Sequence, residues 1–186
     1  MSDSLESTPQ QIRTRRQFIR CAGGLAAAVW AAPSLAYGQR SLSFVHTHTG
    51  EKLDVTYFRE GVYQPAALAR VAFVLRDFRS GAVHQIDPML LDALHDLQLL
   101  NQHDKPYEVI SAYRSPLTNA RLRNQTTGVA EHSMHVHGKA IDVRVPGISV
   151  KKLRDLALNM NRGGVGYYPK SNFLHLDTGR LRTWQG

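Results

Sequence analysis

The sequence predicts an α+β fold, in which helices pack against a small, mostly antiparallel sheet with one open face. Segments that alternate between apolar and polar residues, as strands do, occur at both ends of the chain's main part and in its middle. Segments between them carry apolar residues at the spacing of helices. With 186 residues and 42% hydrophobic content, the chain can bury one sizeable core. We therefore expect one main domain, over residues 37–186.

Residues 1–36 are expected to form an export signal of the twin-arginine type. Thr14–Arg20 reads TRRQFIR, an Ala/Gly-rich apolar run follows, and Ser34–Ala36 supplies a cleavage site of small residues. The apolar run is shorter than the roughly 20 residues of a stable membrane span, although an uncleaved signal would act as an anchor. We expect cleavage after Ala36, a mature protein in the periplasm, and only transient membrane contact.

Charge and cysteine content narrow the classes of partner. The formal net charge of +8 favours an anionic partner, such as nucleic acid, anionic lipid or a cell-wall polymer. Export, together with the lack of a basic stripe interleaved with aromatic residues, argues against nucleic acid. The single cysteine, Cys21, would leave with the signal, so no disulfide is expected within the mature domain.

The first half of the domain contains one predicted hairpin and two predicted helices. In residues 42–58, two alternating runs flank Thr49 and Gly50, which is typical of a β-hairpin. Residues 66–79 have the apolar spacing of an amphipathic helix. A second helix begins with Asp87 as N-cap and Pro88 in its first turn. One face of this helix is expected to hold Leu91, Leu94, Leu97 and Leu100.

The second half alternates strands and helices. Residues 107–114 have the β-branched and aromatic content of a strand, and Pro116 opens a short polar helix that reaches about Gln125. A long loop then runs to Gly138. The remaining predicted elements are a strand over 139–145, a helix over 150–160 capped by Ser149, and a terminal strand pair over 163–169 and 172–179.

A carboxylate in the middle strand needs a partner. Asp142 alternates with core-forming residues, and burying an unpaired carboxylate is costly. His135 lies seven residues earlier, and Gly138 between them allows a tight reversal of the backbone. A metal ion bound by both is one solution. The alternative is a structural ion pair of Asp142 with Arg144 or Lys139.

The last strand adds a second imidazole. His175 and Asp177 in FLHLD are two residues apart, so they project from the same side of a strand while leucines pack behind. Together, His135, Asp142 and His175 offer two imidazoles and one carboxylate. A catalytic zinc centre uses about three protein ligands and keeps one open position. We therefore predict a metal cleft on the open face of the sheet.

Two motifs carry a resemblance to a known family. SMHVHGKAID, Ser133–Asp142, matches the Ser-x-His-x-x-Gly-x-Ala-x-Asp motif of zinc peptidases that include D-alanyl-D-alanine carboxypeptidases and murein endopeptidases. SAYRS, Ser111–Ser115, matches their Ser-Gly-Tyr-Arg-Ser segment. Across roughly residues 41–186, with YRSPLTNARLR, HVHGKAIDVRVPG and FLHLDTGRLRTW in order, the chain resembles the murein endopeptidase K family.

The resemblance implies hydrolysis of peptide bonds in the stem or cross-bridge of peptidoglycan. It implies Zn²⁺ as cofactor, bound by His135, Asp142 and His175. It favours cleavage of a cross-bridge, such as one between two diaminopimelate residues, over removal of a terminal D-alanine. Arg114 is expected to hold a substrate carboxylate or to steady the developing oxyanion through its fixed fork of donors.

The chain departs from the family pattern at the position expected for the general base. Relatives carry an acidic residue or a histidine three places before the last histidine ligand, and this chain has Asn172 there. Asp177 is the predicted base, because it shares a strand face with His175. Asp177 could equally orient His175 as a hydrogen-bond partner. His132 and His137 are the rival candidates.

Two further alternatives stay open. The departure at Asn172 leaves room for a peptidoglycan-binding or assembly module in which a metal is purely structural. A mixed set of imidazoles and carboxylate also accepts divalent ions other than zinc. Beyond the last predicted strand, Arg180, Arg182 and Trp184 either meet glycan or stem-peptide carboxylates or form a basic tail with one packed indole.

Overall fold

The computed structural model describes residues 38–125 and 129–186. The predicted signal, its cleavage site after Ala36, and Cys21 lie outside the described residues, as do residues 126–128 of the predicted long loop. The described residues belong to one compact unit, Leu35–Gly186. Among them, no helix combines the length and apolarity needed to cross a membrane.

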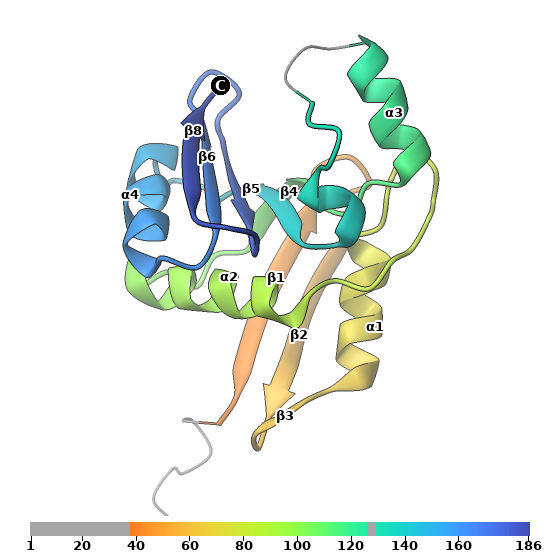
Figure 1. Cartoon of the computed structure of the whole chain (residues 1–186). Coiled ribbons are helices and arrows are strands. Elements are labelled where there is room, and N and C mark those ends of the chain that lie inside the picture. Colours follow the sequence, from red (N-terminus) through yellow and green to blue (C-terminus); the bar gives the residue numbers. More distant parts are fainter. Residues whose placement is uncertain (1–37, 126–128) are drawn as a thin grey trace, which may run out of the picture. The chain divides into compact units, whose positions relative to one another are not determined.

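Within residues 38–125 and 129–186, eight strands form one sheet in the order β3-β2-β1-β4-β5-β7-β6-β8 (Figure 1). Two pairs of neighbours, β1 with β4 and β6 with β8, run parallel, and the other neighbours are antiparallel. The strands are β1 Arg40–His46, β2 Lys52–Arg59, β3 Val62–Tyr63, β4 Tyr107–Ser111, β5 Ala140–Arg144, β6 Gly164–Tyr168, β7 Phe173–Asp177 and β8 Arg182–Gln185.

The predicted α+β class is confirmed, but the sheet is mixed and larger than the small, mostly antiparallel sheet that was expected. Between β1 and β4 the chain passes through β2, β3, α1 and α2, and this long crossover lets β4 run parallel to β1. The last strand, β8, runs parallel to β6 because β7 lies between them in sequence and reverses the chain.

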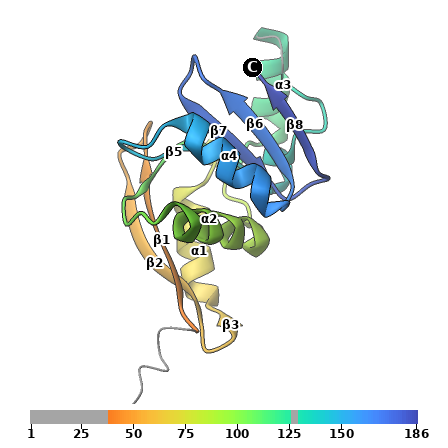
Figure 2. The ribbon, with the colours of Figure 1, turned by 90° about the vertical axis from the view of Figure 1, so that its left-hand side faces the viewer.

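Helices cover one face of the sheet. The α1 helix packs on β2, α2 on β1 and α4 on β6 and β7, and Figure 2 shows α2 and α4 side by side over the strands. The hydrophobic core fills the space between these helices and the sheet. The helices are α1 Pro65–Val74, α2 Pro88–Asn101, α3 Pro116–Gln125 and α4 Val150–Met160, and a 3-10 turn, η1, spans Met134–His137.

Most of the predicted turns and helix caps are present in the structure. The hairpin of β1 and β2 is present, and α2 begins at its predicted cap, where the Asp87 carboxylate accepts a hydrogen bond from the Met89 amide at 2.9 Å. Ser149 caps α4 in the same way. The predicted face of α2 is wrong at Leu100, which is 53% exposed. Leu100 lies nine residues after Leu91, and at about 100° per residue it faces the opposite side.

The first helix ends five residues earlier than predicted, at Val74 instead of residue 79. The reason is a buried polar cluster around Asp77, whose carboxylate accepts hydrogen bonds from the Ser115 amide, the Ser115 hydroxyl and the Ser80 hydroxyl. Asp77 is 1% exposed. These bonds require a turn at Asp77, and a turn ends the helix.

The boundaries of two strands also differ from the prediction. The β4 strand ends at Ser111 instead of residue 114, because the next amides bond elsewhere: Tyr113 N–H donates to Leu75 and Arg114 N–H to His135. The segment after β7 is not a tail. Arg182 and Trp184 belong to β8, which adds an edge strand beside β6.

Candidate metal centre

A single row of residues crosses the open face of the sheet. Asp142 of β5 lies directly opposite His175 of β7, and His175 in turn lies opposite Gly166 of β6. Residues that precede and follow Asp142 and His175 along their strands belong to the core. The alternation predicted for both strands therefore holds, and strand register brings the carboxylate and the imidazole together.

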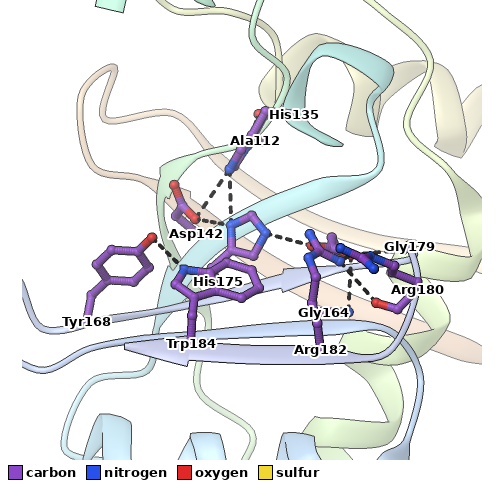
Figure 3. Close-up of polar contacts among 11 residues, drawn as sticks. Ala112, His135, Asp142, Gly164, Tyr168, His175, Gly179, Arg180, Arg182 and Trp184 are labelled. Atoms are coloured by element: carbon purple, nitrogen blue, oxygen red, sulfur yellow. Dashed lines mark hydrogen bonds and ion pairs between the residues drawn. The ribbon is translucent and has the colours of Figure 1, made fainter. Parts of the chain in front are cut away.

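His135 reaches this row from outside the sheet. It lies on η1, which is closed by Gly138 in the left-handed conformation at φ 64°, where a side chain would collide with the Gln85 carbonyl. The His135 Nδ1 atom donates to the Ala112 carbonyl at 2.6 Å. This bond leaves the lone pair on Nε2, which lies 3.2 Å from His175 Nδ1 and 3.4 Å from Asp142 Oδ1 (Figure 3).

Asp177 orients the His175 ring from the side opposite Asp142. Its Nε2 atom donates to Asp177 Oδ2 at 3.0 Å, and its Nδ1 atom lies 2.8 Å from Asp142 Oδ1. Asp177 is itself held by two bonds from Arg182, one to each carboxylate oxygen, at 3.0 and 2.6 Å, and by the amides of Gly164 and Gly179. A hydrogen-bond partner of this kind fixes both the tautomer and the ring plane of a histidine ligand.

Burial and neighbouring charges act in opposite directions on the ionisable groups. Burial alone would raise the pKa of Asp142, but His135 and His175 outweigh it and hold that pKa well below its usual range. Burial alone would lower the pKa of His175, but Asp142 and Asp177 outweigh it and raise that pKa to about 9. Without a metal ion, the cluster therefore favours an ionised Asp142 carboxylate beside a protonated His175.

The donor set fits a divalent metal ion. One ligand atom from each of His135, Asp142 and His175 lies within 4.8 Å of the other two, and all three residues are buried. In the neutral imidazoles, which is the form that binds a metal, the two nitrogens that face the centre are those left without a proton by the Ala112 and Asp177 bonds. Nitrogen and oxygen donors in this number match a zinc site that keeps a position open.

The cluster lies in a cleft of about 640 Å³. One wall comes from residues 129–135, and the other from the ends of β6, β7 and β8. Figure 1 shows α3 and the C-terminal strands on opposite sides of β4 and β5. The predicted position of the metal cleft, on the face of the sheet away from the helices, therefore agrees with the structure.

Arg114 lines the same cleft. Its backbone amide donates to the His135 carbonyl at 3.1 Å, and its guanidinium donates through one nitrogen to Asn119 Oδ1 at 3.2 Å. The Nε atom is buried and meets no acceptor among the described residues. Burial lowers the pKa of Arg114, while Asp142 acts against this shift. A buried guanidinium with spare donors is suited to binding a carboxylate or a carbonyl oxygen.

The candidates for the base lie in different places. His132 and His137 are both exposed, but only His132 lines the cleft. Asp177 lies behind His175, on the nitrogen that faces away from Asp142. Asn172 is exposed in the turn between β6 and β7 at φ 55°, a left-handed conformation that asparagine adopts more readily than most residues.

Sequence reasoning overlooked Tyr168 and left open whether Trp184 meets the substrate or packs in a basic tail. Tyr168 and Trp184 both line the cleft, and the Trp184 indole donates to the Tyr168 hydroxyl at 2.9 Å (Figure 3). The sequence signal that could have identified Tyr168 is the pair of alternating glycines, Gly164 and Gly166, that precedes it. Glycines at alternate positions leave one face of a strand without side chains, which allows close approach of a neighbour.

An α+β domain with two histidines and one aspartate converging in an open cleft belongs to the class of metal-dependent hydrolases. Comparison with known proteins specifies the family. The family model described as "Peptidoglycan L,D-endopeptidase MepK" matches residues 34–184. The chain belongs to this peptidase family, as its motifs had suggested.

Individual relatives agree with the family match. The peptidoglycan L,D-endopeptidase MepK of Escherichia coli K12 is 41% identical over 175 residues, which cover 91% of this chain and 96% of the relative. The probable peptidoglycan L,D-endopeptidase MepK of Haemophilus influenzae is 39% identical over 171 residues, which cover 88% and 92%. No solved structure shows a significant match.

Proposed function

We propose that this protein is an exported zinc metallo-endopeptidase that hydrolyses peptide cross-links of bacterial peptidoglycan. The observation that carries the proposal is the convergence of His135, Asp142 and His175 in a cleft, in a chain of the MepK family. The relatives are named L,D-endopeptidases, which favours a bond between an L and a D centre of the cross-bridge. The positive charge of the chain suits an anionic polymer as substrate.

Zinc is the proposed ion, held by His135 Nε2, His175 Nδ1 and one oxygen of Asp142. When bound, zinc polarises a peptide carbonyl and lowers the pKa of water towards about 7, so that a nucleophile forms without an activated serine or cysteine. Arg114 binds the substrate through the donors that the protein leaves unused, at a carboxylate or at the carbonyl oxygen.

The contacts of Asp177 support the orienting role among its two predicted roles. Its Oδ1 atom accepts from Arg182 and two amides, and Oδ2 accepts from His175 and Arg182. A carboxylate with both oxygens engaged behind the ligand is better placed to hold His175 than to take a proton from water. His132, which lines the cleft, is then the proposed base.

Two substitutions separate these roles. Asp177→Asn is expected to weaken zinc affinity by about 10- to 100-fold and to regain most activity at saturating zinc. His132→Ala is expected to keep zinc affinity and to lose about 10²- to 10⁴-fold in kcat. His137→Ala, outside the cleft, is the matched control, and a large loss there would move the base role to His137. A loss in Asp177→Asn that zinc cannot restore would assign the base to Asp177.

Export is part of the proposal. Peptidoglycan lies outside the cytoplasmic membrane, and Thr14–Arg20 with the following apolar run supports a twin-arginine route to the periplasm. Cleavage after Ala36 would release residues 37–186. N-terminal sequencing of the protein recovered from the periplasm tests both the route and the site, and a cytoplasmic protein beginning at Met1 would contradict them.

The decisive experiment uses isolated peptidoglycan. The purified protein is expected to release uncross-linked fragments, to stop when a chelator is added, and to resume with zinc. Mass analysis of the fragments identifies the bond that is cut. Binding to peptidoglycan without release of fragments, in protein that contains zinc, would favour the alternative of a non-catalytic wall-binding or assembly module.

A further inference from the structure

The C-terminal strand places an indole ring against a metal ligand. Gly166 of β6 lies directly opposite His175 on one side and Trp184 on the other. A Cβ atom at Gly166 would lie 2.6 Å from two atoms of the indole, so the ring occupies the space that a side chain at Gly166 would fill. The indole thereby reaches His175, with the two ring centres 5.1 Å apart. Only glycine at this position lets Trp184 cross β6.

The indole then holds a tyrosine. Trp184 Nε1 donates to the Tyr168 hydroxyl oxygen at 2.9 Å, and the Tyr168 ring stacks on Phe173 with 4.4 Å between ring centres and 16° between planes. The hydroxyl oxygen is therefore an acceptor in this pair, and its own hydrogen meets no acceptor among the described residues. Tyr168 has one hydrogen-bond donor to offer, and it lines the cleft.

Tyr168 and Arg114 flank the metal ligands. In the sheet order, β4 precedes the strands of Asp142 and His175, and β6 follows them. Arg114 comes just after β4, and Tyr168 ends β6. Both residues line the same cleft. A peptide bound over the ligands would thus meet a guanidinium on one side and a phenol O–H on the other.

We propose that Tyr168 is a catalytic residue, whose hydroxyl donates a hydrogen bond to the peptide oxygen that becomes negatively charged during hydrolysis. Trp184 is its positioning residue. This inference rests on the proposed peptidase function. A preorganised donor aimed at a developing oxyanion stabilises the transition state more than the bound substrate, so its removal lowers kcat more than it changes KM.

The test replaces Tyr168 by Phe in the full, zinc-loaded protein, which keeps the ring stack on Phe173 and removes the donor. With a purified cross-linked muropeptide dimer as substrate, kcat is expected to fall by about 100-fold, with zinc content and KM nearly unchanged. A phosphinate analogue of the cleaved bond, which mimics the tetrahedral intermediate, is expected to bind more weakly by a similar factor. Tyr167→Phe is the matched control, since that ring packs under Arg154 on the other face of β6.

A second variant tests the positioning role. Trp184→Phe keeps an aromatic ring over Gly166 but loses the N–H that holds Tyr168. It is expected to lower kcat in the wild-type background and to have little further effect in Tyr168→Phe. Independent, multiplicative losses in the two backgrounds would overturn this role, because two residues that act through one hydroxyl must be coupled.

The outcomes distinguish this inference from the proposed function. An active wild type with an equally active Tyr168→Phe overturns the role of Tyr168 alone. A raised KM with unchanged kcat also overturns it, because Tyr168 would then bind the ground state. A wild-type protein that contains zinc and releases no fragment overturns the proposed function and this role together.

Discussion

Two buried carboxylates, in two different polar clusters, show how the same group can serve structure in one place and a candidate metal site in another. Asp77 is 1% exposed and Asp142 is 8% exposed. Burial by itself would raise the pKa of both, and both pKa values are instead held well below the usual range. For Asp77 the groups responsible are hydroxyls and an amide. For Asp142 they are two imidazoles.

The difference between the partners determines what each cluster can do. Hydroxyl and amide hydrogens point at Asp77 and satisfy it completely. Around Asp142, the two nearest nitrogens belong to rings whose other nitrogen already donates its proton elsewhere. When both rings are neutral, three acceptors converge, and a metal cation satisfies all of them. Hydrogen-bond direction therefore distinguishes the structural carboxylate Asp77 from the candidate metal ligand Asp142, although burial does not.

The largest expected effect is on the metal cluster. Asp142→Ala removes the only anionic ligand, so we expect zinc content to fall to near zero and peptidoglycan hydrolysis to fall by about 10³-fold or more. Elemental analysis and fragment release measure the two effects. A variant that kept its zinc and its activity would show that Asp142 is as purely structural as Asp77.

For the cluster around Asp77 we expect a loss of stability without a loss of zinc. Asp77→Ala leaves the buried Ser115 amide without an acceptor and removes the carboxylate that the Ser80 and Ser115 hydroxyls share, which should lower the free energy of unfolding by about 3 kcal/mol. Zinc content should stay at the wild-type level. Urea unfolding measures the loss, and Asp104→Ala, an exposed aspartate, is the control. Loss of zinc at unchanged stability would contradict the structural role of Asp77.

A smaller effect is expected from pH in the chelator-treated protein. The pKa of His175 is raised to about 9, so its contribution to stability is present below the unfolded pKa of about 6.5 and is lost as pH rises towards 9. The pKa of Asp77 is lowered, so its contribution is present above about pH 4 and is lost in acid. Unfolding curves between pH 5 and 9 measure the alkaline loss.

Zinc provides the control for this pH dependence. Ligation keeps His175 deprotonated, so the alkaline loss of stability should disappear in the zinc-loaded protein, whereas the acid loss from Asp77 should remain in part. A chelator-treated protein that is equally stable at pH 6.5 and pH 9 would contradict the raised pKa of His175.

The smallest expected effect comes from a hydrogen bond at the surface. Ser149 accepts from the Lys152 amide at 3.2 Å at the start of α4. Ser149→Ala should lower the free energy of unfolding by about 1 kcal/mol, because solvent replaces the cap only in part. Ser149→Asp restores an acceptor and serves as the control. A loss as large as that of Asp77→Ala would mean that burial does not set the strength of these bonds.

Local patterns in the sequence predicted most elements correctly. The capping residues Asp87 and Ser149, the hairpin at Thr49 and Gly50, and the polar sides of β5 and β7 depend on neighbours a few residues away, so they can be recognised in the sequence. The end of α1 could not be predicted in this way. It depends on Ser115, which lies 38 residues from Asp77 in the sequence.

For the candidate site, the sequence by itself determined which side chains face away from the core, because alternation along a strand is a local property. Only the tertiary structure decided that Asp142 stands opposite His175 and that Gly166 and Trp184 continue the same row. A register shift of one residue would have moved His175 to the other face. Pairing between distant strands depends on the hydrogen bonds and packing of the whole sheet, which no short segment encodes.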